Sequence, residues 1–500
     1  MKSPRISLMN PIVTDFLRVG ICRFLARLFM GVRGLFIVTT LTPHDLGQYA
    51  IWLLFVVYFS MLDFGVLNSL ERDIPHYRGA GEDEDLKETL NTGWSTFFIL
   101  TLAASLLLGV IAFLVFHRFY LALLLFLYLF ADKLWRAHET NSRIHFQFRE
   151  NGIALLLLAS SSLMIIWILV PRIGASGIFV GFIIGSLSSA YYLFQKSPLT
   201  FRWEYHWRDS LRYIKSAIPL AIFIYAVELF HILAVTILAI HWDKATLGYF
   251  VFAFRIFQIC LALFPYLIQQ VMRTRMYFHI AAQKDKREDD LQHLLFPMGI
   301  YSIFSSIFWL FLYWWSDWLV GYLAPLYGKS VVTLQLLALA LLPTGITQVC
   351  SDYLCSHVHK MTKAVIVAWI FAIIFQGSFL YFGAVPENAI LHSIPKIYLA
   401  STLLIYCLIV PMAFRMRNNT IVATLRLIYL LLPVGIAYTV NIFLRDLFHF
   451  APSRSLGDNL TPFFAANVLT YFGVAVVLYM TRNHKTFNVF LKHSNIGPLV

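Results

Sequence analysis

The stretch that decides the fold runs from Leu121 to Phe130 and reads LALLLFLYLF, ten consecutive residues of the hydrophobic class. A strand of a membrane β-barrel alternates polar and apolar residues, whereas a helix that crosses a bilayer stays apolar along its length. The run therefore favours a transmembrane helix, and similar runs recur along most of the chain. The sequence predicts an all-α, polytopic integral membrane protein.

The composition supports the same fold class. Of the 500 residues, 59% are hydrophobic and 13% are charged, and the mean hydropathy is +0.71. A soluble protein of this size cannot bury so much apolar surface, and intrinsic disorder requires low hydrophobicity. Five cysteines without framework spacing exclude a disulfide-rich secreted scaffold. In such a chain the net charge of +13 is a topology signal, so no nucleic-acid partner is expected.

About 20 apolar residues of helix cross a bilayer core, and fourteen segments meet that length. They lie near residues 12–41, 47–70, 92–116, 119–138, 152–171, 174–194, 214–240, 247–271, 293–314, 331–353, 364–384, 397–414, 421–443 and 461–480. With the N terminus inside, 26 of the 39 Lys and Arg residues fall in cytoplasmic segments and seven in outside segments. This bias predicts a multi-pass protein of the cell inner membrane with both termini in the cytoplasm.

A short sequence repeats in the outside turns that precede two of the predicted helices. Leu46 to Tyr49 read LGQY within TPHDLGQYAIWLLF, and Leu247 to Phe250 read LGYF within DKATLGYFVFAF, about 200 residues later. The repeat divides the chain into two six-helix bundles, 1–195 and 214–414, followed by two additional helices within 421–480. Both bundles begin on the cytoplasmic side, as in transporters built from parallel repeats.

The first seventy residues contain a set of motifs that are common singly and unusual together. These are Arg33-Gly34, LTPHDLGQY from Leu41 to Tyr49, LDFGV from Leu62 to Val66, and Arg72. Pro43 and Gly47 form a P-x-x-x-G turn, and Asp63 and Gly65 close the next helix as D-x-G. The chain thereby resembles the polysaccharide flippases, O-antigen type, of the multidrug/oligosaccharidyl-lipid/polysaccharide exporter superfamily.

That resemblance implies two helical bundles around a central cavity that opens alternately to each side of the membrane. It implies a lipid-linked oligosaccharide substrate carried on a polyprenyl diphosphate, with membrane lipids as surroundings. It also implies glycan polymerases and glycosyltransferases of the same pathway as partners, in the synthesis of O-antigen or exopolysaccharide. It does not identify the glycan.

Four arginines mark the first predicted span. Charged groups inside spans cost about 2.5–3.5 kcal/mol each and are functional candidates by default. At 100° per residue, Arg18, Arg23, Arg27 and Arg33 occupy one half of the helix. Arg18 reaches the cytoplasmic surface in one interpretation. Arg23, Arg27 and Arg33 are predicted to line a watery cavity and bind the substrate diphosphate, because guanidinium groups pair well with phosphate oxygens.

Other charged residues in the spans leave alternatives open. Glu228 and His231 lie three apart on the seventh predicted helix, where they would relay a proton, pair with an arginine or form a structural hydrogen bond between helices. Arg255 is a second phosphate candidate, or else an ion-pair partner of Glu228. Asp63 would bind a coupling cation or pair with an arginine of the first helix.

The leading hypothesis is a flippase that performs no chemistry of its own and needs no metal or cofactor. No Walker A, G-x-S-x-G or H-E-x-x-H motif occurs. A cation-coupled multidrug exporter of the same superfamily is the first alternative. A membrane-embedded glycan polymerase or ligase is the second, although such an enzyme needs a sizeable outside loop and the predicted outside loops are short.

Overall fold

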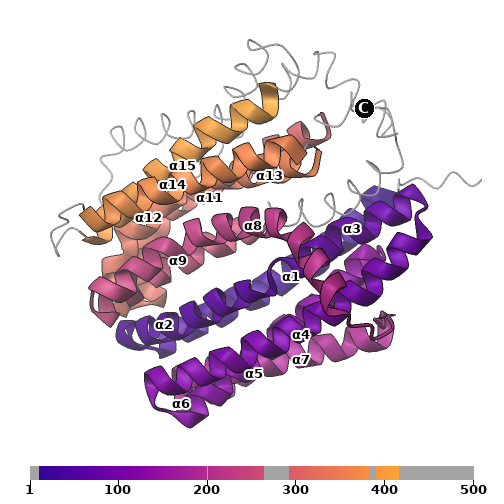
Figure 1. Ribbon diagram of the computed structural model, residues 1–500. Helices are drawn as coiled ribbons and strands as arrows, with labels where there is room; N and C mark the ends of the chain where they lie inside the picture. The colour runs from indigo at the N-terminus through magenta and orange to yellow at the C-terminus, as the bar shows by residue number, and fades with distance from the viewer. Residues whose placement is uncertain (1–10, 200, 264–291, 358, 383–389, 416–500) are drawn as a thin grey trace, which may run out of the picture.

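The computed structural model describes residues 11–199, 201–263, 292–357, 359–382 and 390–415. Every regular element within these ranges is helical, which confirms the all-α fold class (Figure 1). The long helices are α1 (Pro11–Thr40), α2 (Pro43–Ser60), α3 (Val66–Ala80), α4 (Asp83–Phe116), α5 (Phe119–Ile144), α6 (Phe148–Ile173), α7 (Ala175–Lys196), α8 (Trp207–His241), α9 (Lys244–Leu263), α11 (Gln292–Leu323), α12 (Val331–Leu339), α13 (Leu341–His357), α14 (His359–Phe382) and α15 (Ile390–Arg415). Two short 3-10 helices, η1 (Met61–Asp63) and η2 (Pro325–Ser330), precede α3 and α12.

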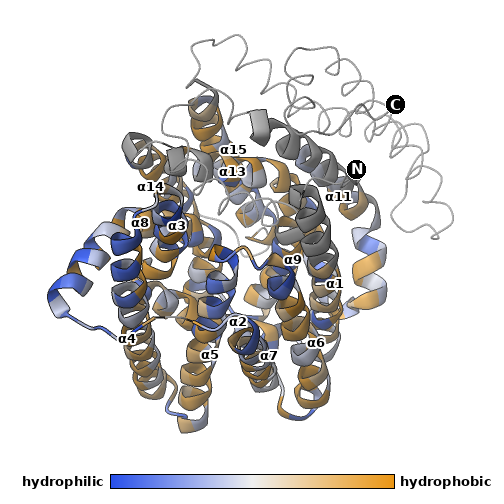
Figure 2. Cartoon of the chain, turned by 90° about the vertical axis from the view of Figure 1, so that its right-hand side faces the viewer, coloured by the Kyte–Doolittle hydropathy of each residue, from blue (hydrophilic) through white to orange (hydrophobic). Residues whose placement is uncertain are grey.

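Many of these helices are built to cross a membrane. Within the described residues, eight are long and apolar enough, or nine if α12 and α13, bent by 43° at their junction, form one span. Figure 2 shows hydrophobic colour along most of α4, α5 and α6. The expected spans 421–443 and 461–480 lie outside the described residues, so the count of fourteen stays a prediction.

The helices pack in two groups. Apart from α2 and α9, helices α1 to α7 contact chiefly one another, and so do α8 to α15 (Figure 1). The crossing of α2 and α9 supplies most of the contact between the groups. The residues that build this crossing are those of the repeated turns.

The two repeated turns begin their helices in the same way. The side chain of Thr42 accepts a hydrogen bond from the backbone N–H of Asp45 and donates one to its carboxylate, at 2.7 Å. At the start of α9, Asp243 accepts hydrogen bonds from the backbone and the hydroxyl of Thr246, the latter at 2.6 Å. The same two residue types therefore cap both helices, with their positions exchanged.

A reciprocal glycine contact holds the two capped turns together. A Cβ atom at Gly47 would overlap the backbone carbonyl of Lys244, and a Cβ atom at Gly248 would overlap that of Pro43. Each glycine thus meets the residue that begins the other helix, as expected at an interface related by a two-fold axis. Only glycine allows the two backbones to approach this closely.

The second predicted span is broken rather than continuous over 47–70. Helix α2 ends at Ser60, and the chain passes through η1 before α3 begins. Phe64 and Gly65 have φ angles of 50° and 73°, in the left-handed region that interrupts a helix. A Cβ atom at Gly65 would also collide with Ala221 of α8, so the D-x-G motif marks a tight turn against the second group of helices.

Candidate functional site

Arg33 lies in the last third of α1, and its side chain contacts α6 and α7. Its guanidinium donates a 2.6 Å hydrogen bond to the hydroxyl of Ser162 and lies 4.3 Å from the centre of the Phe182 ring. No carboxylate among the described residues pairs with it. A hydroxyl and an aromatic face hold the guanidinium in place but leave its charge unneutralised.

Arg27 and Arg255 are near enough to Arg33 for their charges to repel it. Arg27 is partly buried one to two turns earlier on α1 and contacts the sulfur of Met30. Arg255 projects from α9 in the other group of helices. The structure therefore brings three of the predicted phosphate ligands together, whereas the side chain of Arg23 lies outside the described residues.

Arg255 is held by its own helix. Its guanidinium donates a 3.0 Å hydrogen bond to the side-chain carbonyl of Gln258. The alternative interpretation, an ion pair with Glu228, is not present between these described residues, although the two charges attract each other. A neutral partner leaves the positive charge of Arg255 available to a ligand.

Glu228 and Arg136 are charged residues on membrane-spanning helices whose side chains are not buried by the protein. Glu228 is exposed, and the side chain of Arg136 is 58% exposed. Because a charged group is costly in lipid, we interpret this exposure as a water-filled hollow between helices. Glu228 comes from α8 and Arg136 from α5, so this space is bordered by both groups of helices.

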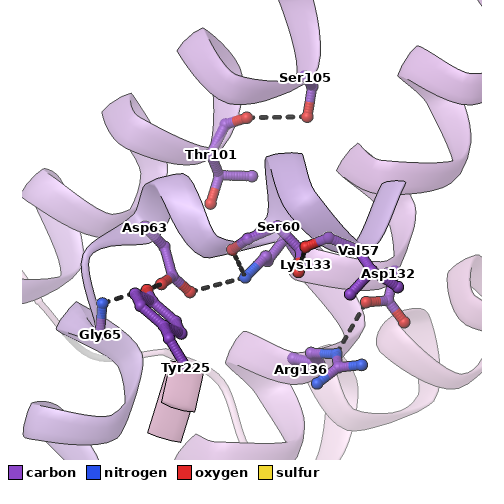
Figure 3. Close-up of polar contacts among 10 residues, drawn as sticks. All are labelled: Val57, Ser60, Asp63, Gly65, Thr101, Ser105, Asp132, Lys133, Arg136 and Tyr225. Atoms are coloured by element: carbon purple, nitrogen blue, oxygen red, sulfur yellow. Dashed lines mark hydrogen bonds and ion pairs between the residues drawn. The ribbon is translucent and has the colours of Figure 1, made fainter. Parts of the chain in front are cut away.

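The charges around Glu228 come from both groups of helices. Arg136, Arg255 and Lys133 all attract its carboxylate. Among the described residues Glu228 makes neither a hydrogen bond nor an ion pair. Arg136, by contrast, is paired with Asp132 one turn earlier on α5, at 2.7 Å (Figure 3).

His231 has a different environment from Glu228. One ring nitrogen lies 2.6 Å from the hydroxyl of Tyr398 on α15, and the other lies 2.9 Å from the side-chain amide nitrogen of Gln348 on α13. The residue is buried beside Phe230. Of the three predicted roles, the structure shows the hydrogen bond between helices. Glu228 and His231 do not act on one shared partner.

Asp63 forms a buried ion pair, but not with an arginine of α1. Its carboxylate lies 2.6 Å from the ammonium group of Lys133 on α5, which also donates to the backbone carbonyl of Ser60 (Figure 3). The other oxygen accepts hydrogen bonds from the hydroxyl of Tyr225 on α8 and from the backbone N–H of Gly65. These contacts explain the D-x-G motif, since the aspartate closes the turn that the glycine permits.

Lys133, Arg136 and Tyr225 are the residues that the sequence analysis did not single out. Lys133 and Arg136 lie near the cytoplasmic end of the expected span 119–138, where basic residues are typical of the topology alone. In the structure α5 continues to Ile144, so these charges lie along an unbroken helix. The i, i+4 spacing of Asp132 and Arg136 was the available signal, since it places both on one helical face.

No group of three or more His, Cys, Asp or Glu side chains within the described ranges is arranged to hold a metal ion. Within these ranges the candidate site has two parts. One is the group of Arg27, Arg33 and Arg255 together with the carboxylate of Glu228, and the other is the buried ion pair of Asp63 and Lys133.

Known proteins share this fold. No protein-family model matches the chain, and no curated protein sequence does. Among solved structures, the lipid II flippase MurJ in an inward closed conformation has a TM-score of 0.66 and 14% identity, covering 93% of this chain and 98% of that one. A multidrug resistance MATE family transporter of the MOP superfamily, in an outward-facing conformation, has a TM-score of 0.59 and 16% identity over 83% and 98%.

A third structure, a mutant of the Vibrio cholerae MATE transporter VcmN, has a TM-score of 0.59 and 13% identity and covers 82% of this chain and 98% of that one. At such identities the likeness concerns the fold. The chain has the fold of MOP superfamily transporters, a class of multi-pass helical membrane proteins that includes both a lipid flippase and drug transporters.

Proposed function

We propose that this protein is a flippase that moves a polyprenyl-diphosphate-linked oligosaccharide across the cytoplasmic membrane by alternating access. The observation that carries the proposal is the placement of Arg33 and Arg255, two cations from opposite groups of helices without a carboxylate partner among the described residues. Each phosphate of a diphosphate diester carries one negative charge. Two guanidinium groups near enough to feel each other's charge match the charge of the diphosphate and its oxygens.

The fold supports a cycle between two states. The Gly47–Gly248 crossing joins the two groups of helices at turns that the charge bias of the loops assigns to the outside. Movement of the two groups of helices about this crossing would close the hollow on one side and open it on the other. The likeness to a flippase of lipid II supports a lipid-borne substrate. O-antigen or exopolysaccharide precursors, delivered by glycosyltransferases and used by a polymerase, fit the resemblance of the N-terminal motifs.

The test is translocation by purified protein in liposomes, with a fluorescent polyprenyl diphosphate disaccharide as probe. Arg33→Gln and Arg255→Gln should each slow translocation by about 10- to 100-fold, because a hydrogen bond to a charged group contributes about 1.5–3 kcal/mol. The control is Arg118→Gln, which removes an exposed arginine in the turn between α4 and α5. Full translocation by the Arg33→Gln/Arg255→Gln double variant, folded as the parent is, would refute the site.

A cation-coupled multidrug exporter is the second candidate, and Glu228 favours it. An exposed carboxylate without a described partner, inside a hollow, is suited to bind a proton or a cationic drug. Glu228→Gln distinguishes the two functions. If it abolishes drug efflux from cells while lipid translocation in liposomes continues, the exporter is the better description; if neither process depends on it, this second candidate has no support.

A further inference from the structure

The connection between α7 and α8, together with the first two residues of α8, forms a segment that the proposed function does not use. It runs from Arg202 to Arg208 and reads RWEYHWR, and all seven side chains are exposed. We refer to these residues as the linker segment. Aromatic residues occupy every second position, and Trp203 and Trp207 are 60% and 63% exposed.

The linker segment is fixed in place despite this exposure. The backbone N–H of Arg202 donates to the side chain of Asn91 at 2.8 Å, and that of Glu204 donates to Ser95 at 3.2 Å. From Arg202 to Glu204 the extended chain advances about 6.6 Å, and from Asn91 to Ser95 the helix rises about 6 Å. The two lengths agree, so the segment runs alongside α4. Just before it, the Phe201 ring stacks on Phe98. The backbone that carries the exposed aromatic rings is therefore held against α4.

The surroundings of the linker segment are basic. Five Lys or Arg residues and two acidic residues occur between Lys196 and Lys215. Arg212, one turn after the segment on α8, has a side chain that is 78% exposed. Exposed aromatic rings with a surplus of arginines suit a partner surface whose outer layer is negatively charged and whose deeper layer is apolar.

The height of the segment along α4 identifies that surface. At the start of α8 the hydroxyl of Ser210 lies 2.9 Å from that of Thr96 on α4. The first large apolar side chain exposed on α4 is Leu102, six residues further, or about 9 Å along the axis. The polar layer of one bilayer leaflet is about 5–8 Å thick. The contacts of the linker segment on α4 lie about 9 Å or more from Leu102, so the segment lies at the outer edge of the lipid head groups on the side on which α4 begins.

We propose that the linker segment binds anionic phospholipid head groups, with Trp203, Tyr205 and Trp207 in the interfacial layer and the arginines on lipid phosphates. Tryptophan and tyrosine prefer the bilayer interface, and each basic residue near an anionic leaflet strengthens binding about fivefold. The segment joins the two groups of helices, so lipid binding would fix the connection about which they move. This site is independent of the hollow.

Hydrogen–deuterium exchange of the purified chain in lipid nanodiscs tests the proposal. Peptides that cover the segment should exchange several-fold more slowly in discs containing phosphatidylglycerol than in discs of phosphatidylcholine alone. A triple variant, Arg202→Gln/Arg208→Gln/Arg212→Gln, should lose that difference. The matched control, Arg118→Gln/Arg172→Gln, removes exposed arginines near the opposite ends of the helices and should keep it.

A second variant separates the aromatic contribution. Trp203→Ala/Trp207→Ala should raise exchange in both kinds of disc, because the rings would no longer enter the interface. Equal exchange of the parent chain in the two kinds of disc would overturn the proposal, as would a difference that the triple variant retains. Since the variants leave Arg33 and Arg255 intact, failure here is distinct from failure of the flippase proposal.

Discussion

Helices α2 and α9 begin alike, whereas the helices that precede them, α1 and α8, differ in the charges they carry inward. Both turns are capped by a threonine–aspartate pair and both are followed by a glycine that contacts the other turn. By contrast, α1 brings the cation Arg33 near Arg255, and α8 brings the carboxylate Glu228 within the attraction of Arg255. The chain repeats the features that join its halves and varies those that face the space between them.

This difference separates structural from functional charge. Residues that recur in both halves, such as Gly47 and Gly248, satisfy a packing requirement that the two-fold arrangement imposes twice. Residues that occur in only one half serve either the proposed transport function or a local structural need, such as the ion pair of Asp63 and Lys133. Substitution of these residues distinguishes those that stabilise the fold from those that serve transport.

The largest effect is expected at Lys133. This charged residue occurs in only one half of the chain, and we assign it a structural role. Lys133→Met leaves the buried carboxylate of Asp63 without its cation, which costs about 3–5 kcal/mol of unfolding free energy. The double variant Asp63→Asn/Lys133→Met should recover most of that loss. Thermal unfolding in detergent measures both.

The neighbouring Asp132→Asn provides the control for this prediction. Asp132 belongs to the same helix, but its partner Arg136 is largely exposed, so its loss should cost at most about 1 kcal/mol. If Lys133→Met unfolded at the same temperature as the parent, the pair would not hold the fold together, and a role in transport would be the better explanation.

A smaller effect is expected from the repeated glycines. Gly47→Ala and Gly248→Ala place a methyl group against a backbone carbonyl that cannot rotate away, and overpacking of this kind costs about 1–3 kcal/mol. The two variants should be affected to a similar extent because their contacts are reciprocal. Gly31→Ala, with no atom within 4 Å of the added methyl group, is the control for thermal unfolding. A large loss in only one of the pair would break the proposed equivalence of the halves.

The smallest effect concerns the caps. The hydroxyl of Thr246, with the backbone N–H groups of Thr246 and Ala245, holds the pKa of Asp243 below its usual value. The stabilisation is thus complete above the unfolded pKa, about 3.9, and is lost as the pH falls through the lower folded value. Since Asp243 is largely exposed, the effect should not exceed about 1 kcal/mol, the typical contribution of a cap.

Asp243→Ser retains a capping oxygen that does not titrate. The thermal unfolding midpoint is measured near neutral pH and again below about pH 4. Its decrease between the two conditions should be smaller in this variant than in the parent. An identical acid response in the two proteins would show that the α9 cap contributes nothing to the pH dependence.

The sequence predicted the helices better than it predicted the contacts of the site. Runs such as Leu121–Phe130 identify a helix without knowledge of its neighbours. The partner of Asp63 was predicted on α1 and lies on α5, 70 residues away in sequence. Helical spacing places residues on a face of their own helix, but it says nothing about which other helix supplies the opposing charge. The same limit applies to Glu228 and His231, which lie three apart yet face different surroundings.

The sequence by itself determined the fold class, the repeated turn and the position of the arginines along α1, because a bilayer imposes its demand on each segment separately. Only the tertiary structure decided that Lys133 neutralises Asp63, that His231 bonds to Tyr398, and that Arg33 and Arg255 meet across two groups of helices. Coulombic attraction and hydrogen bonding depend on distances between side chains that are remote in the chain. Packing alone sets those distances.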